Sequence, residues 1–182
     1  MTEEQSDKAL FGAGCFWGVQ YYFDQVPGVT ATVAGYSGGQ TKNPTYEEVS
    51  SGRTGHAEVI EVRYDPEVVR FRDILTVFFG SHDPTTLNRQ GADVGTQYRS
   101  VVFYTTPAQQ QEAASFIKEI DDSNSEGAQV VTTVEPLRVF YEAEDYHKNY
   151  AARNKESQYC QLVINPKLEK VQQKFAALLK HI

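Results

Sequence analysis

Strand-like and helix-like segments alternate along almost the whole chain, and this pattern limits the fold more than any other feature. Apolar runs such as "KALFGAG", "HAEVIEVRYD" and "RSVVFYT" are typical of strands, and segments with helical spacing such as "CFWGVQYYFDQV" and "PAQQQEAASFIKEID" separate them. Neither an internal repeat nor a long linker interrupts the alternation. We expect one α+β domain over 1–182, a two-layer sandwich on a mixed sheet, with a flexible N-terminus at 1–7 and a C-terminal tail and helix at 150–182.

Residues 83–98 and the last 41 or so residues do not continue the simple alternation. The first of these segments, "DPTTLNRQGADVGTQY", has no regular period, and a structureless segment of this length usually lines a site. Residues 142–154 indicate a polar helix, and "PKLEKVQQKFAALLKHI" predicts an amphipathic one. The apolar stripe of that last helix consists of Leu168, Val171, Phe175 and Leu178. We therefore expect long loops around a site and a helical C-terminus.

Charge and cysteine content argue against several classes of protein. The net charge of -7 disfavours nucleic acid as a partner. The N-terminal "MTEEQSDK" lacks the basic and apolar regions of a secretion signal, and no apolar run approaches the roughly 18 residues of a membrane span. Two cysteines are too few for a disulfide scaffold, so any bridge between them is expected to be transient. We expect a cytoplasmic monomer that binds neither nucleic acid nor membrane.

The stretch "GAGCFWG" places Cys15 between glycines and two large aromatic side chains. If a strand ends at Gly14 and a helix begins at Cys15 or Phe16, the sulfur lies at the positive end of the helix dipole, which stabilises a thiolate. A nucleophilic thiol is one interpretation, and a small buried side chain is the other. The flanking glycines and the adjacent Trp17 favour the nucleophile.

Longer motifs then follow one another in a fixed order along the chain. They are "GCFWG", "GYSGG", "PTYEEV", "GHAEVIEV", "HDPTTLNRQGADVGTQYRS" and "EAEDYH". With them the chain resembles the peptide methionine sulfoxide reductase A family from about Phe11 to His147. The resemblance implies a fold related to ferredoxin-like sandwiches and reduction of the S epimer of methionine sulfoxide, free or in proteins. It also implies that Cys15 is the nucleophile and passes through a sulfenic acid, in a reaction that repairs oxidative damage.

Sulfoxide reduction also needs an acid that delivers a proton to the oxygen. In "HAEVIEVRYD" the strand alternation places Glu58 on the same side as Ile60 and Val62, where burial should raise the pKa of its carboxyl group. The alternative is a carboxylate at the sheet margin that pairs with a cation such as Arg99. Position within "GHAE" matches the catalytic glutamate of the family, so we interpret Glu58 as the acid.

The remaining site residues are expected to bind the substrate. Phe16 and Trp17 can form an apolar pocket for the S-methyl group, although a place in the aromatic core is the other interpretation, which for Phe16 is equally favoured. By resemblance, Tyr46 and Tyr98 supply hydroxyl groups near the sulfoxide oxygen, and Asp93 organises the site and the substrate backbone. The other tyrosines are interpreted as structural.

Metal and cofactor sites are not expected. The two cysteines and four histidines are scattered, with neither C-x-x-C nor H-x-x-x-H, and no glycine-rich loop has the spacing of a nucleotide site. His147 matches a family position near the site, where its role would be supportive. Electrons should therefore arrive by thiol exchange, with thioredoxin as the expected reductant.

Two other classes of function remain open from the residues. A cysteine hydrolase would use Cys15 with His56 or His147 and an aspartate such as Asp83. A binding module would use the aromatic residues as a ligand pocket and would not need the thiol. Methionine formed from its sulfoxide in the presence of dithiothreitol, and lost in Cys15→Ser, would exclude both.

Cys160 is the only other cysteine and the candidate resolving thiol. Gly18 stands where some family members have a second cysteine, and "SQYCQLVINPKLEKVQQKF" replaces the usual glycine-rich C-terminal segment. A mobile tail could bring Cys160 to the sulfenic acid and form a Cys15–Cys160 disulfide. Alternatively, "YCQLVI" is a short strand in which Cys160 is buried as packing.

Overall fold

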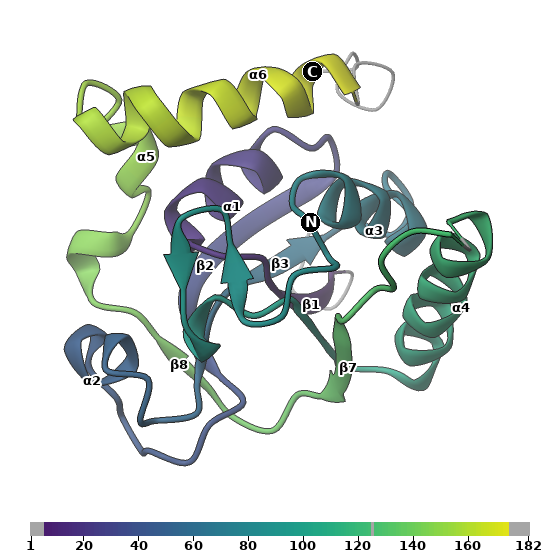
Figure 1. The fold of residues 1–182 in the computed structure, drawn as a ribbon, viewed down its shortest axis with the longest axis horizontal. Helices are drawn as coiled ribbons and strands as arrows, with labels where there is room; N and C mark the ends of the chain where they lie inside the picture. Colours follow the sequence, from purple (N-terminus) through teal and green to yellow (C-terminus); the bar gives the residue numbers. More distant parts are fainter. Residues whose placement is uncertain (1–5, 125, 175–182) are drawn as a thin grey trace.

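A six-stranded mixed sheet forms the centre of the computed structural model, which describes residues 6–124 and 126–174 (Figure 1). The strands lie in the order β7-β6-β1-β3-β2-β8, and β6 and β7 are parallel whereas the other neighbours are antiparallel. They are β1 (Asp7–Gly12), β2 (Val29–Ser37), β3 (Ala57–Tyr64), β6 (Val101–Tyr104), β7 (Thr133–Pro136) and β8 (Phe140–Glu142). The predicted mixed sheet is confirmed.

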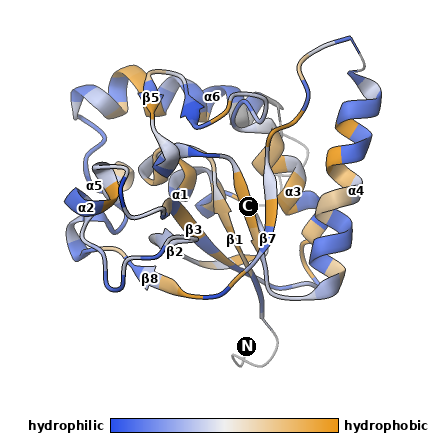
Figure 2. Ribbon diagram, turned by 60° about the horizontal axis from the view of Figure 1, so that its bottom comes forward, coloured by the Kyte–Doolittle hydropathy of each residue, from blue (hydrophilic) through white to orange (hydrophobic). Residues whose placement is uncertain are grey.

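Helices cover one face of this sheet and make the second layer (Figure 2). The helices are α1 (Phe16–Asp24), α2 (Tyr46–Ser50), α3 (Phe71–Gly80), α4 (Pro107–Ser123), α5 (Tyr150–Arg153) and α6 (Asn165–Lys174). Side chains of α1, α3 and α4 share one buried cluster with the sheet, in which the Phe11 ring lies 5.2 Å from that of Phe23 and 5.1 Å from that of Phe78. A smaller cluster on the other face contacts Leu137 and Phe140.

The sequence of β3 explains which side chains face the helices. Ile60 and Val62 belong to the large cluster under the helices, whereas Val59 belongs to the small cluster on the opposite face. Because successive side chains of a strand point to opposite faces, Glu58 lies on the helix side with Ile60 and Val62. The strand alternation therefore predicted the side of the sheet on which this carboxyl group is buried.

Two loop regions differ from the sequence prediction. Residues 83–98 contain a small hairpin of β4 (Arg89–Gln90) and β5 (Asp93–Val94) followed by a 3-10 turn at Thr96–Tyr98. The predicted polar helix at 142–154 is wrong, because the chain forms a 3-10 turn at Asp145–His147 and then α5. Asn149 separates them with a left-handed backbone (φ 53°), which a continuous α-helix does not allow.

The two ends of the chain also refine the prediction. Asp7 pairs with Tyr64 in the sheet, so the first strand begins inside the predicted flexible segment, whose residues 1–5 lie outside the described part. In α6, Leu168 packs against the large core cluster, while Phe175 and Leu178 lie beyond the described residues. Among the described helices, none has the length and apolar character needed to cross a lipid bilayer.

Gly35 provides a test of the β2–β8 pairing. A Cβ atom at this position would overlap the ring of Phe140 and the carbonyl oxygen of Tyr141, so Gly35→Ala should lower the free energy of unfolding by about 1–3 kcal/mol. Urea unfolding followed by circular dichroism measures this loss. Gly52→Ala is the control, because its Cβ meets no atom within 4 Å and only its positive φ (76°) opposes the change. Equal stability of Gly35→Ala and the parent chain would contradict the pairing.

Candidate active site

Cys15 lies at the junction between β1 and α1. The strand ends at Gly12, and Cys15 is the N-cap residue of α1, with φ −56° and ψ 121°. Gly14 has a positive φ of 91°, and the Gln90 side chain occupies the space where a Cβ of residue 14 would lie. The predicted strand-to-helix junction is confirmed, and Cys15 is a free cysteine that is partly exposed as a residue although its thiol is buried.

The surroundings of the thiol do not stabilise a thiolate, contrary to the sequence prediction. Burial raises the pKa of Cys15 well above its ordinary value, and the charges of Glu58 and Asp93 raise it further. Hydrogen bonds from the Trp17 backbone and the Tyr159 hydroxyl lower this pKa by a smaller amount. The helix N-terminus thus acts in the predicted direction, but desolvation outweighs it, and the resting group is a thiol.

Glu58 lies beside this junction as a buried acid. Its side chain is 1% exposed, Oε1 accepts a hydrogen bond of 3.2 Å from the Phe16 N–H, and Oε2 is buried without a partner. Burial raises the pKa of the carboxyl group to about 8. Pairing with Arg99 is not observed, because that guanidinium donates to the carbonyl oxygens of Thr96 and Gly55. At neutral pH, the carboxyl group of Glu58 is therefore largely protonated.

Phe16 and Trp17 follow the thiol and are held by aromatic neighbours. Phe16 is fully buried, and its ring centroid lies 5.1 Å from that of His147. Trp17 stacks on Tyr150 at 3.8 Å, and its Nε1 donates to His147 Nδ1 at 2.9 Å. The edge-on ring of Tyr159 is 5.8 Å away. These contacts fix the indole next to the thiol.

The loops bring the other three predicted residues to Glu58 and Cys15. Tyr46 is the first residue of α2, and burial followed by the charge of Glu58 raises the pKa of its hydroxyl to about 12. Burial and Glu58 also raise the pKa of Tyr98, at the end of the 3-10 turn, so both hydroxyls keep their protons. Asp93 of β5 accepts a hydrogen bond of 3.2 Å from the Tyr159 hydroxyl.

Cys160 lies in a small buried cluster against which Trp17 and Tyr159 of the site pack. It begins a π-helical turn, Cys160–Ile164, and is completely buried with Ala151 and Ile164. The short strand at "YCQLVI" in the alternative interpretation is wrong, because the segment is helical, but the burial of Cys160 that it predicted is confirmed. Both cysteines are free thiols.

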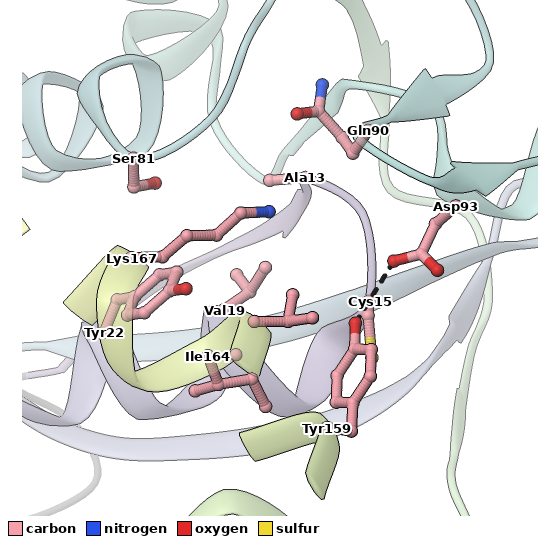
Figure 3. A pocket seen from close by; sticks show the side chains of 12 residues that line it. Ala13, Cys15, Val19, Tyr22, Ser81, Gln90, Asp93, Tyr159, Ile164 and Lys167 are labelled. Carbon is pink, nitrogen blue, oxygen red and sulfur yellow. Dashed lines mark hydrogen bonds between the residues drawn. The ribbon is translucent and has the colours of Figure 1, made fainter. Parts of the chain in front are cut away.

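A cavity of about 20 Å³ separates the thiol from the C-terminal helix (Figure 3). Cys15, Asp93 and Tyr159 lie together at one end of it, and Lys167 lies on the side of Tyr22 and Ser81. This space accommodates roughly one water molecule. The C-terminal segment therefore covers one side of the thiol.

Two residues of the site carry more contacts than the sequence suggested. His147 has no exposed surface, and its Nε2 is buried without a partner while Nδ1 accepts the Trp17 N–H. Tyr159 reaches both Cys15 and Asp93. Its position before Cys160 was the only sequence signal that separated it from the other tyrosines. No feature of the "AEDYH" motif predicted that His147 contacts Trp17, because the two residues are 130 positions apart.

Metal ligands do not cluster in the part of the chain that the structure describes. No group of three or more histidine, cysteine, aspartate or glutamate side chains among residues 6–124 and 126–174 could hold a metal ion. The groups that the structure places at the site are a thiol beside a protonated carboxyl group, with tyrosine hydroxyls and aromatic rings around them.

Comparison with known proteins agrees with this chemistry. A family model described as peptide methionine sulfoxide reductase matches residues 7–179. The peptide methionine sulfoxide reductase MsrA of Picrophilus torridus is 51% identical over 169 residues, which are 93% of this chain and 95% of that protein. MsrA of Chromobacterium violaceum is 49% identical over 175 residues, 96% of this chain and 99% of that protein.

Solved structures give the same result for the fold. Methionine sulfoxide reductase A of Corynebacterium diphtheriae superposes with a TM-score of 0.80 at 36% identity and covers 85% of this chain and 78% of its own. Mxr1 from Saccharomyces cerevisiae in its reduced form gives 0.79 at 32% identity, with 87% and 91% coverage. The chain therefore belongs to the peptide methionine sulfoxide reductase A family of oxidoreductases, as its motifs predicted.

Proposed function

We propose that this enzyme reduces methionine S-sulfoxide, free or within proteins, by direct attack of Cys15 Sγ on the sulfoxide sulfur. The observation that carries the proposal is the protonated Glu58 beside the thiol, with Oε2 buried and without a partner. An unprotonated oxide is a poor leaving group, so an acid next to the nucleophile meets the main requirement of the reaction. We place this repair reaction in the cytoplasm, where both cysteines stay reduced.

In the first step, Glu58 passes one proton from the Cys15 thiol to the sulfoxide oxygen, so that its own protonation is restored. Cys15 Sγ bonds to the sulfoxide sulfur, Glu58 gives its proton to the oxygen, and Glu58 then takes the proton that the thiol loses. Transfer of the hydroxyl group to Cys15 leaves a sulfenic acid and releases methionine, so that one sulfur is oxidised by two electrons and the other is reduced by two. Because both groups are neutral at rest, the step needs no net charge in a buried site.

The surrounding side chains support this assignment of substrate groups. The protonated hydroxyls of Tyr46 and Tyr98 can donate to the sulfoxide oxygen beside Glu58. The Trp17 indole, next to the fully buried Phe16 ring, would supply the apolar wall that receives the S-methyl group. Asp93 accepts a hydrogen bond from Tyr159 and can accept one from a substrate N–H instead.

The second step would use Cys160 as the resolving thiol. Its sulfur attacks the Cys15 sulfenic acid, a disulfide forms and water leaves. Cys160 is buried in a cluster against which Trp17 and Tyr159 pack, and it is a free thiol, so we expect the segment that carries it to rearrange before the sulfurs meet. A dithiol protein then reduces the disulfide by exchange. Yeast Mxr1 has been solved in complex with Trx2, and a thioredoxin is the reductant to test first.

Neither of the two histidines considered for a cysteine hydrolase, His56 and His147, is free to act as its base. His56 Nδ1 accepts the Gly39 N–H at 2.9 Å and its Nε2 donates to the Thr41 carbonyl oxygen at 2.7 Å, so both ring nitrogens are occupied. Nδ1 of His147 is occupied by Trp17. A binding module remains distinguishable by assay, because loss of methionine formation in Cys15→Ser contradicts it.

Glu58→Gln tests the acid. The amide keeps the shape of the side chain and can still accept the Phe16 N–H, but it cannot donate a proton as an acid, so the single-turnover rate should fall by about 10²-fold or more. Rapid quench with methionine sulfoxide measures the rate. Glu61→Gln is the control, a carboxyl group that is also buried on β3 but points to the other face and pairs with Arg63. Activity of Glu58→Gln within twofold of the parent would contradict the role of Glu58 as the acid.

The pH dependence of the same step follows from the raised pKa of Glu58. The protonated form is the active one, so the single-turnover rate should decline as pH rises through about 8. The pKa of Cys15 is raised far enough that its own ionisation occurs at higher pH. A rate measured from pH 6 to 10 should show the decline in the parent and not in Glu58→Gln. An equal decline in both would assign it to another group.

Cys160→Ser tests the second step. Without reductant this variant should still form one methionine per enzyme, and dithiothreitol should still support turnover, because the Cys15 sulfenic acid remains accessible to small thiols. Turnover with thioredoxin should be lost or sharply slowed. Mass spectrometry of the parent after substrate addition should show the Cys15–Cys160 disulfide. Unchanged thioredoxin-driven turnover, or absence of that disulfide, would reject the resolving role.

A further inference from the structure

Glu144 lies where three segments of the candidate site meet. It immediately precedes the 3-10 turn Asp145–His147, and its side chain is half-buried. Oε1 accepts a hydrogen bond of 2.9 Å from the Tyr36 hydroxyl, at the end of β2. Oε2 accepts the Tyr46 N–H at 3.0 Å, at the start of α2. One carboxylate therefore joins residues that are 108 and 98 positions away in the chain.

Each of these segments carries a ring of the site. The Tyr36 ring lies 5.7 Å from that of Phe16 and is completely buried. Tyr46 carries one of the two hydroxyls near Glu58. The carbonyl oxygen of Glu144 also accepts the His147 N–H at 3.0 Å, and the His147 ring lies 4.5 Å from the Tyr46 ring.

The start of α2 depends on this carboxylate. Thr45 and Glu48 form a capping box, in which the Thr45 side chain accepts the Glu48 N–H and the Glu48 side chain accepts the Thr45 N–H. The box does not bond the N–H of Tyr46, which donates to Glu144 instead. Because α2 has only five residues, one lost hydrogen bond at its first residue can change the direction of the Tyr46 side chain.

The carboxyl group of Glu144 is ionised, which suits a side chain that accepts hydrogen bonds from all of its neighbours. Burial raises the pKa of the carboxyl group, but the hydrogen bonds from the Tyr46 backbone and the Tyr36 hydroxyl reverse the effect and hold it below its ordinary value. An ionised carboxylate is an acceptor only, which matches neighbours that all donate: Tyr36, Tyr46 and the Tyr146 hydroxyl at 3.3 Å.

We propose that Glu144 is a positioning residue for sulfoxide reduction, which directs the Tyr46 hydroxyl and the His147 ring toward the site between Phe16 and Glu58. The proposal rests on the function proposed above, in which Tyr46 donates to the sulfoxide oxygen. Glu144 itself does not touch the reacting atoms, so its effect must pass through the residues it holds.

Three variants of Glu144 distinguish the effect of side-chain length from the effect of charge. Glu144→Gln keeps the length, its amide oxygen can accept the Tyr46 N–H and its amide N–H can donate to the Tyr36 oxygen, so its loss of kcat/KM should be less than about threefold. Glu144→Ala removes the acceptors, and Glu144→Asp keeps the charge but is one methylene too short to reach both partners. Both should lose about 10-fold to 100-fold in kcat/KM. Glu142→Ala, which removes only a surface ion pair with Lys148, should retain the parent value.

A double-mutant cycle identifies the residue through which Glu144 acts. In Tyr46→Phe the hydroxyl is absent, so adding Glu144→Ala should cost much less than it does in the parent. A merely structural role would cost the same factor in both backgrounds. The rate of Cys15 alkylation by iodoacetamide should stay unchanged in all variants, because the thiol and its helix are not held by Glu144. If Glu144→Ala does not fold, as judged by thermal unfolding, Glu144→Asp replaces it in the cycle.

The outcomes separate this proposal from the proposed function. Full activity of Glu144→Ala, additive losses with Tyr46→Phe, or a larger loss in Glu144→Gln than in Glu144→Asp would overturn the positioning role even if Glu58→Gln is inactive. Full activity of Glu58→Gln would overturn the proposed function instead. The expected pattern, with glutamine retaining activity and both aspartate and alanine losing it, supports positioning by reach rather than by charge.

Discussion

The hydrogen bond from the Phe16 N–H to Glu58 Oε1 is the contact on which the site depends. It joins the first residue of α1 to the second residue of β3 across 42 positions, and the thiol is the next residue before Phe16. The sheet makes this contact possible, because β1 and β3 are antiparallel neighbours with Phe11 opposite Ile60. Continued by two residues, that register places Ala13 opposite Glu58, so the junction that carries Cys15 ends beside the acid.

Burial favours the protonated form of both the Cys15 thiol and the Glu58 carboxyl group. Desolvation is the largest influence on the Cys15 and Glu58 pKa values and raises each of them. A helix N-terminus contributes up to about 2 kcal/mol in favourable, partly buried geometries, which is less than the desolvation cost of a buried ion. The site is therefore a pair of neutral acids rather than the thiolate that the helix position alone predicted. In the proposed mechanism, attack and protonation would then occur together, with the proton passing through Glu58.

Local patterns predicted the elements of the fold and the buried acid, whereas long-range contacts decided the features that were missed. The alternation in β3 was enough to place Glu58, because Ile60 and Val62 are unambiguous core residues. The hairpin in 83–98 was missed because it is held by the Gln90 side chain, which bonds to the backbone of Asp83 and has no local signature. The break at Asn149 was missed because asparagine is compatible with a helix, and only tertiary contacts select its left-handed backbone.

The C-terminal segment shows why sequence position alone could not assign a role to Cys160. Tyr159 and Cys160 are neighbours in a helical segment, where successive side chains point about 100° apart. Since the Tyr159 hydroxyl contacts Cys15 and Asp93, the sulfur of Cys160 is directed away from them and into the cluster with Ile164. In the proposed cycle the segment that holds both residues has to rearrange before the two sulfurs meet, and such a rearrangement would disturb the hydrogen bond from the Tyr159 hydroxyl to Asp93.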